Sequence, residues 1–173
     1  MKRKLTFRKA TVADTNTIVQ IGAETFKAAF GRYHTPEDME HYLAVNFNKD
    51  VIQSLIEDDY YNFILGYEVD KLIGYAMLRY GIHPECVSGS RPIELVRFYV
   101  IQEVIGQGYG SELMRACMEE AGAMGYKSIW LDVWENNDRA IRFYEKWGFR
   151  IVGNAQYTIG SDVTNDYIME WSG

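Results

Sequence analysis

One loop constrains the fold of this chain more than any other segment, because its glycines stand between an apolar strand pattern and an amphipathic helix pattern. Residues Ile105–Ser111 read Ile-Gly-Gln-Gly-Tyr-Gly-Ser, with a glycine at every second position. Alternate glycines let the backbone turn tightly and expose successive N–H groups, and the helix behind adds the positive end of its dipole. The loop therefore indicates a phosphate or pyrophosphate site, although a plain strand-to-helix turn would use the same glycines.

The spacing of these glycines argues against two widespread phosphate-binding motifs. A P-loop requires Gly-Lys-Ser/Thr after four spacer residues, and the chain contains no such run. The dinucleotide fingerprint requires Gly-x-Gly-x-x-Gly, but its last position is Ser111 when counted from Gly106 and Leu113 when counted from Gly108. Asp132 lies roughly where a ribose-binding acid would follow, yet without the glycines it carries little weight. A nucleotide-binding dehydrogenase is therefore disfavoured.

The order of strand and helix patterns around the loop predicts a mixed α/β sheet. Strand patterns cover Leu5–Lys9, Tyr60–Val69, Lys71–Tyr80, Ile93–Ile101, Lys127–Trp134, Phe149–Tyr157 and Asp166–Trp171. Helical patterns follow a capping pair at Thr11 and Asp14, restart at Pro36 and continue to about Asp58, follow the glycine loop as far as Gly122–Gly125, and cover Asn137–Trp147. This order predicts three α/β/α layers rather than a doubly wound fold or a helix bundle.

Composition indicates a globular domain and narrows its partners. The 173 residues, of which 47% are hydrophobic and 24% charged, suit a single domain over residues 1–173. The net charge of −6 disfavours a general nucleic-acid binder, which needs a basic face, and is compatible with a cationic substrate.

Cysteine, histidine and apolar patterns bear on location and metal content. No apolar run approaches the roughly 18 residues that a membrane span needs, and the basic start lacks a following apolar region. The two cysteines, Cys86 and Cys117, form neither a disulfide framework nor a metal-type cluster. The three histidines lack metal-ligand spacing. We therefore expect a cytoplasmic protein that uses no metal.

Several short motifs in the second half of the chain follow one another in a fixed order. These are the strand Arg97-Phe98-Tyr99-Val100, the glycine loop, Asn137-Asp138-Arg139-Ala140, Phe143-Tyr144 and Gly148-Phe149. Together they resemble the GCN5-related N-acetyltransferase (GNAT) family, whose three-layer α/β/α sheet has splayed central strands. The segments Phe26–Phe30, Glu94–Val100 and Ile129–Glu135 also resemble the PaiA-type spermidine acetyltransferases.

The resemblance implies where acetyl-CoA binds. Main-chain groups of Phe98, Tyr99 and Val100 would pair with the pantetheine arm much as an added strand does. The pyrophosphate would take N–H groups of Gly106, Gln107, Gly108, Tyr109, Gly110 and Ser111. Asn137 would contact the cofactor arm, although asparagine is also a preferred helix N-cap. One position departs from the family pattern, because Ile105 stands where Gln or Arg opens the loop and offers no side-chain donor.

The resemblance also suggests the catalytic groups. Tyr144 matches the tyrosine that protonates the departing thiolate, against the plainer interpretation of a packed helix tyrosine. An acceptor ammonium has a pKa near 10 and must lose a proton, so a carboxylate near the strand is expected. Glu94 is the candidate, with Val96 and Phe98 on its face of the strand, and Glu135 is the second candidate. A solvated surface role remains the alternative for Glu94.

The early helices are expected to form the acceptor wall. Tyr33, His34, Glu37 and Tyr42 offer aromatic and acidic groups that suit a polyamine, although a polar surface is the plainer interpretation for each. We therefore expect direct acetyl transfer from acetyl-CoA to a primary amine, preferably a polyamine or another small amine. The alternatives are a protein or peptide N-acetyltransferase and a non-catalytic acyl-CoA-binding sensor. Edge strands near the C-terminus suggest a homodimer.

Overall fold

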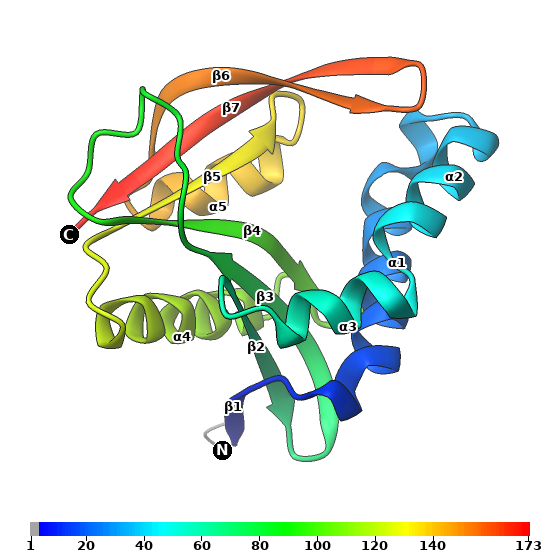
Figure 1. Ribbon diagram of the computed structural model, residues 1–173, viewed down its shortest axis with the longest axis horizontal. Coiled ribbons are helices and arrows are strands. Elements are labelled where there is room, and N and C mark those ends of the chain that lie inside the picture. The colour runs from blue at the N-terminus through cyan, green and yellow to red at the C-terminus, as the bar shows by residue number, and fades with distance from the viewer. Residues whose placement is uncertain (1–3) are drawn as a thin grey trace.

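The computed structural model describes residues 4–173 as one seven-stranded mixed sheet with helices on both faces (Figure 1). The strands are β1 (Leu5–Lys9), β2 (Tyr61–Glu68), β3 (Lys71–Arg79), β4 (Pro92–Val100), β5 (Ser128–Trp134), β6 (Arg150–Ile159) and β7 (Asp162–Ser172). They are ordered β1-β2-β3-β4-β5-β7-β6, and only the pair β4 and β5 is parallel. The predicted mixed α/β sheet is confirmed.

The helices divide between the two faces of the sheet. They are α1 (Thr15–Phe30), α2 (Pro36–Asn46), α3 (Lys49–Glu57), α4 (Tyr109–Ala123) and α5 (Asp138–Lys146). One core cluster joins α4 and α5 to β3, β4 and β5, and a second joins α1 and α3 to the opposite face of β2 and β3. The three-layer prediction is therefore confirmed. Among residues 4–173, none of the helices is both long enough and apolar enough to span a bilayer.

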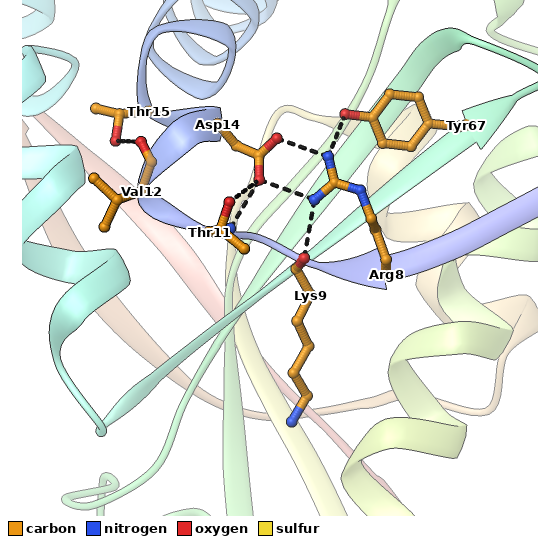
Figure 2. Close-up of polar contacts among 7 residues, drawn as sticks. All are labelled: Arg8, Lys9, Thr11, Val12, Asp14, Thr15 and Tyr67. Atoms are coloured by element: carbon orange, nitrogen blue, oxygen red, sulfur yellow. Dashed lines mark hydrogen bonds and ion pairs between the residues drawn. The ribbon is translucent and has the colours of Figure 1, made fainter.

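A polar cluster fixes the chain between β1 and α1 (Figure 2). The Asp14 carboxylate accepts the Thr11 N–H at 2.8 Å and the Thr11 hydroxyl at 3.1 Å. The Arg8 guanidinium donates to both oxygens of Asp14, at 2.7 and 2.9 Å, and to the Tyr67 hydroxyl on β2 at 3.1 Å. The predicted capping pair thus exists, but it closes a short 3₁₀ turn, Val12–Asp14, that precedes α1.

The hairpin of β6 and β7 is longer than the sequence pattern predicted. The expected strands stopped at Tyr157 and resumed at Asp166, whereas the observed ladder continues to Ile159 and Asp162 around Gly160, which has φ +60°. The extension is mostly polar and exposed, so it shows no alternating apolar pattern. Each of the other predicted strands ends within one residue of the observed strand. β6 forms one edge of the sheet, and the expected homodimer stays a prediction.

The tip of this hairpin docks on the start of α2 and the turn before it, as Figure 1 shows at the top of the molecule. His34 Nδ1 lies 3.0 Å from Asp162 Oδ2, and the hydroxyls of Tyr42 and Tyr157 lie 2.6 Å apart. The Ser161 hydroxyl donates to Asp38 at 3.4 Å. The hairpin therefore bridges the sheet to the α1–α2 side of the molecule.

Candidate active site

The central feature of the sheet is the divergence of β4 from β5. These strands pair only where Pro92–Glu94 face Ser128–Trp130, so the rest of each strand runs free of the other. The Ile101 N–H donates to Ile73 in β3 at 3.0 Å. Because paired groups alternate along an antiparallel ladder, the main-chain groups of Phe98 and Val100 point away from β3, toward the gap. This is the splayed arrangement expected for the central strands.

A β-bulge at Val96 corrects one prediction about this strand. Leu95 pairs with Leu78 and Arg97 pairs with Met77, so Val96 is an extra residue between them. An extra residue reverses the alternation of side chains beyond it. Val96 packs on the α1–α3 face with Met77, whereas Phe98 packs on the α4–α5 face. The expectation that Glu94, Val96 and Phe98 share one face was therefore wrong.

The gap opens into a cavity of about 1000 Å³ that contains most of the predicted site. One end is lined by the glycine loop, Asn137 and Tyr144, and the other by side chains from α1, α2 and the β6–β7 hairpin. The Asn137 side chain accepts the Ala140 N–H at 3.2 Å, so this residue caps α5 as well as lining the cavity. The capping interpretation and the site interpretation of Asn137 are thus compatible.

Two glycines of the loop adopt left-handed backbone conformations. Gly106 and Gly108 have φ of +79° and +91°, a region that other residues rarely adopt, and α4 begins directly after them. Gly106, Gly108, Gly110 and Ser111 line the cavity. Within residues 4–173, the N–H groups of Gly106 and Gly108 donate no main-chain hydrogen bond, whereas the Ser111 N–H donates to the Gly108 carbonyl.

Two predicted loop residues turn their side chains away from the cavity. The Gln107 amide donates to the Glu103 carbonyl at 2.7 Å, and the buried Tyr109 hydroxyl donates to Glu68 at 2.6 Å. Neither residue is part of the cavity wall. The Gln107 side chain therefore does not replace the donor that Ile105 lacks, and only main-chain groups of these two residues remain candidates.

Tyr144 lies at the junction of the gap and the α4–α5 face. Its ring packs against Phe98 and Phe149, with ring centres 6.3 and 5.6 Å away, and only 9% of the residue is exposed. Burial raises the pKa of this phenol well above its usual value. Tyr144 therefore stays protonated near neutral pH and can donate a proton into the cavity.

Three carboxylates share the opposite face of the sheet near the gap. Glu94 lies beside Trp130 in the register, Asp132 lies two residues further along β5, and Asp166 pairs with Trp134. All three carboxylates line the cavity. Burial raises the pKa of each, and that of Asp166 reaches about 6. Asp166 was not predicted from the sequence, and no role in the site was predicted for Asp132.

Glu94 differs from the other two carboxylates in having a strong partner. The Arg79 Nε donates to Glu94 Oε2 at 2.7 Å, and the Arg79 Nη2 contacts the same oxygen. A second guanidinium, that of Arg97, donates to the Asn46 carbonyl at 3.2 Å and lies over the Phe47 ring. The acceptor end therefore holds three carboxylates against two guanidinium groups.

The predicted acceptor residues divide between the cavity and the surface. His34 and Tyr42 line the cavity, where both contact the β6–β7 hairpin. Tyr33 packs its ring 4.6 Å from that of Trp134 but remains outside the wall, and Glu37 is exposed. Glu135 also lies outside, where it accepts from Asn165 at 3.4 Å. The structure thus brings together only part of the predicted wall.

Cations on α5 that were not predicted from the sequence line the same cavity as the glycine loop. They are Arg139, Arg142 and Lys146. Their spacing of three and four residues places them on one face of the helix, which is the sequence signal that could have found them. Among the described residues, no group of three His, Cys, Asp or Glu side chains is arranged to hold a metal ion.

Comparison with known proteins identifies the class to which this fold and cavity belong. Residues 21–149 match the Acetyltransferase (GNAT) family, so the chain belongs to that family. It is an N-acetyltransferase that uses acetyl-CoA as co-substrate.

Individual relatives extend the likeness over nearly the whole chain. An uncharacterized N-acetyltransferase of Mycobacterium tuberculosis is 28% identical over 158 residues, which cover 91% of this chain and 97% of the relative. The spermine/spermidine N(1)-acetyltransferase of Bacillus subtilis is 28% identical over 76% of this chain and 86% of its own. The crystal structure of PaiA N-acetyltransferase from Thermoplasma acidophilum with coenzyme A superposes with a TM-score of 0.80 at 22% identity, over 98% of this chain and 99% of that one.

Proposed function

We propose that this enzyme acetylates a small polycationic amine, with polyamines such as spermidine and spermine the preferred class. The observation that carries the proposal is the acceptor end of the cavity, where Glu94, Asp132 and Asp166 share one face of the sheet. Several ammonium groups on one flexible substrate can interact with several carboxylates at once. The polyamine acetyltransferase of Bacillus subtilis among the relatives supports the same substrate class.

Aromatic side chains complete an acceptor pocket suited to cations. Phe26 and Tyr42 stack with ring centres 4.5 Å apart, and both line the cavity with Trp134. Aromatic faces attract ammonium groups, and their apolar surface accommodates the methylene chain between those groups. The docked β6–β7 hairpin covers this end of the cavity, which favours a slender acceptor over a folded protein surface.

The other end of the cavity would bind acetyl-CoA. We assign the pantetheine amides to the main-chain groups of Phe98 and Val100, and the pyrophosphate to the N–H groups of the glycine loop. Arg139 and Arg142 would supply the positive charge that Ile105 cannot, because they line the cavity from α5. With positive charge supplied from α5, the loop could bind phosphate even though Ile105 departs from the family pattern.

The chemistry then follows from the groups at the centre of the cavity. The thioester supplies an activated acetyl carbon, and the amine attacks it directly. Tyr144 protonates the departing thiolate, which its raised pKa allows because the phenol remains protonated. Glu94, held by Arg79, helps to draw the acceptor ammonium into the cavity.

The first experiment measures release of the CoA thiol from acetyl-CoA with spermidine, spermine, an aminoglycoside and short peptides. Wild-type enzyme should turn over polyamines fastest, and Tyr144→Phe should lower kcat by about 100-fold, the usual minimum for losing a general acid. The matched control is Tyr60→Phe, because Tyr60 is 60% exposed and is not part of the cavity wall. That variant should behave as wild type.

Other outcomes favour the alternatives. Turnover of peptides but not of polyamines would establish a peptide N-acetyltransferase and refute the polyamine assignment. Tight acetyl-CoA binding without turnover of any amine would favour a sensor module.

A further inference from the structure

The reaction needs a proton acceptor that is free to approach the incoming ammonium group, and Glu94 does not meet that need. Its Oε2 oxygen is held by the Arg79 guanidinium through both Nε and Nη2. Burial raises the pKa of Glu94, but this charge-assisted pair opposes the rise and occupies an oxygen that would otherwise take the proton. A neighbouring carboxylate without such a partner is therefore the better base.

Asp132 is that carboxylate. Among residues 4–173, no side chain hydrogen-bonds or ion-pairs with it, although it lines the cavity. Its neighbours Leu131 and Val133 are buried on the α4–α5 face, so Asp132 points to the other face, toward the acceptor end. It stands on β5 across the gap from the strand that carries Phe98 and Val100.

We propose that Asp132 is the general base of this acetyltransferase and removes the proton from the acceptor ammonium. The inference deepens the proposed function, on which it rests for the presence of an amine at this end of the cavity. Glu94 and Arg79 then contribute to the electrostatic potential around the base, and neither takes the proton.

Charged and titratable groups surround Asp132 from every neighbouring element. Glu94 on β4 and Asp166 on β7 interact with its charge, as do Arg79 on β3, Tyr144 on α5 and Tyr42 on α2. Burial raises the pKa of Asp132, against the smaller opposing effects of its own N–H and of Arg79. A raised pKa makes the carboxylate a stronger base toward the ammonium proton.

The Asp132 carboxylate takes one proton from R–NH₃⁺, and the freed electron pair of nitrogen forms the C–N bond to the thioester carbon. The C–S bond breaks with its electron pair on sulfur, and the Tyr144 hydroxyl supplies the proton that makes the CoA thiol. The nitrogen sheds its second proton, which restores Tyr144, and the proton on Asp132 passes to solvent. One acetamide, one thiol and one released proton result.

The test compares Asp132→Asn with Glu94→Gln, using the best amine found in an acceptor panel of polyamines, arylalkylamines, amino acids and peptides. Asp132→Asn should lower kcat by about 100-fold or more, with acetyl-CoA binding unchanged, and should abolish the acidic limb of the pH profile of kcat, measured at saturating amine so that changes in KM do not enter. Glu94→Gln should raise the KM for the amine and keep the acidic limb. Glu145→Gln, an exposed change on α5, should match wild type.

Two results would overturn the assignment. One is an Asp132→Asn enzyme that keeps the acidic limb, or keeps kcat within about threefold of wild type. The other is an acidic limb that disappears in Glu94→Gln instead. If the best amine is not a polyamine, the proposed substrate class fails, but the pH profiles still test Asp132 on that amine.

Thermal unfolding separates a base from a structural residue. A carboxylate whose pKa is raised by folding destabilises the folded state above that pKa, and the effect vanishes below the unfolded value of about 3.9. Asp132→Asn should therefore keep or raise Tm at pH 8, with a smaller difference near pH 4. A fall in Tm of several degrees at pH 8 would assign Asp132 a structural role and overturn the proposal.

Discussion

Replacing Asp14 by asparagine should lower the free energy of unfolding, because this one carboxylate joins β1 to the start of α1 (Figure 2). The hydrogen bond from Arg8 is the largest cause that holds the pKa of Asp14 at about 2, below its usual 3.8. That difference corresponds to at most about 2.4 kcal/mol, at about 1.36 kcal/mol for each pH unit. The Arg8 side chain is 48% exposed, so solvent screens the pair and we expect about 1 kcal/mol.

The pH dependence of this loss identifies its cause. Asp14 has a folded pKa below its unfolded value, so its stabilisation is complete above about pH 3.9 and is lost as pH falls through about 2. Urea unfolding of wild type and Asp14→Asn should therefore differ by about 1 kcal/mol at pH 7. The difference should shrink steadily toward the lowest pH at which the wild type still folds.

A matched control is Glu112→Gln, which breaks the exposed pair of Glu112 with Arg115 on α4. That change should alter the free energy of unfolding by less than about 0.5 kcal/mol. Equal stability of wild type and Asp14→Asn at pH 7 would refute the reasoning. So would a deficit that stays constant down to acid pH, since it would not come from the ionised carboxylate.

Two further predictions concern the ends of the cavity. Replacing Arg139 and Arg142 together by glutamine should raise the KM for acetyl-CoA severalfold at about 50 mM salt. The difference in KM between variant and wild type should be smaller at about 500 mM salt, because ions screen the charges. If the ratio of variant KM to wild-type KM is the same at both salt concentrations, the two arginines do not face the phosphates. Asp166, with a pKa of about 6, loses its charge below that pH, so the KM for spermine should rise between pH 7 and 5. In Asp166→Asn this rise should be weaker, and an unchanged rise would exclude Asp166 from the spermine site.

The sequence was sufficient to predict the order of the elements, because each has a strong local pattern. Alternating apolar residues mark the strands, and the glycines before α4 mark the turn where positive φ is needed. The face of Glu94 relative to Phe98 was predicted incorrectly for a physical reason. A bulge adds one residue without changing the apolar character of the strand, so Val96 looks like an ordinary strand residue.

The acceptor residues were harder to predict, because they come together only through strand pairing. Asp166 reaches the cavity since β7 folds back along β5 in a register that places it opposite Trp134. The spacing of residues along the sequence does not predict that register. Glu135 and Glu37 looked equally suitable from their residue types, yet each lies outside the cavity wall. Residue type therefore predicts the chemistry of an acceptor site better than it predicts which residues form it.

Helix α5 links the two ends of the proposed reaction. Its N-cap Asn137 and its cations Arg139 and Arg142 line the cavity, and Tyr144 follows on the same nine-residue helix. Because this short helix is capped by the Asn137 side chain and packs Tyr144 against Phe149, we expect it to respond to a bound ligand as one unit. Binding of phosphates by the arginines would thus set the position of the phenol that protonates the thiolate. Loss of the arginines should then lower kcat as well as acetyl-CoA affinity, an effect that a purely local phosphate contact would not produce.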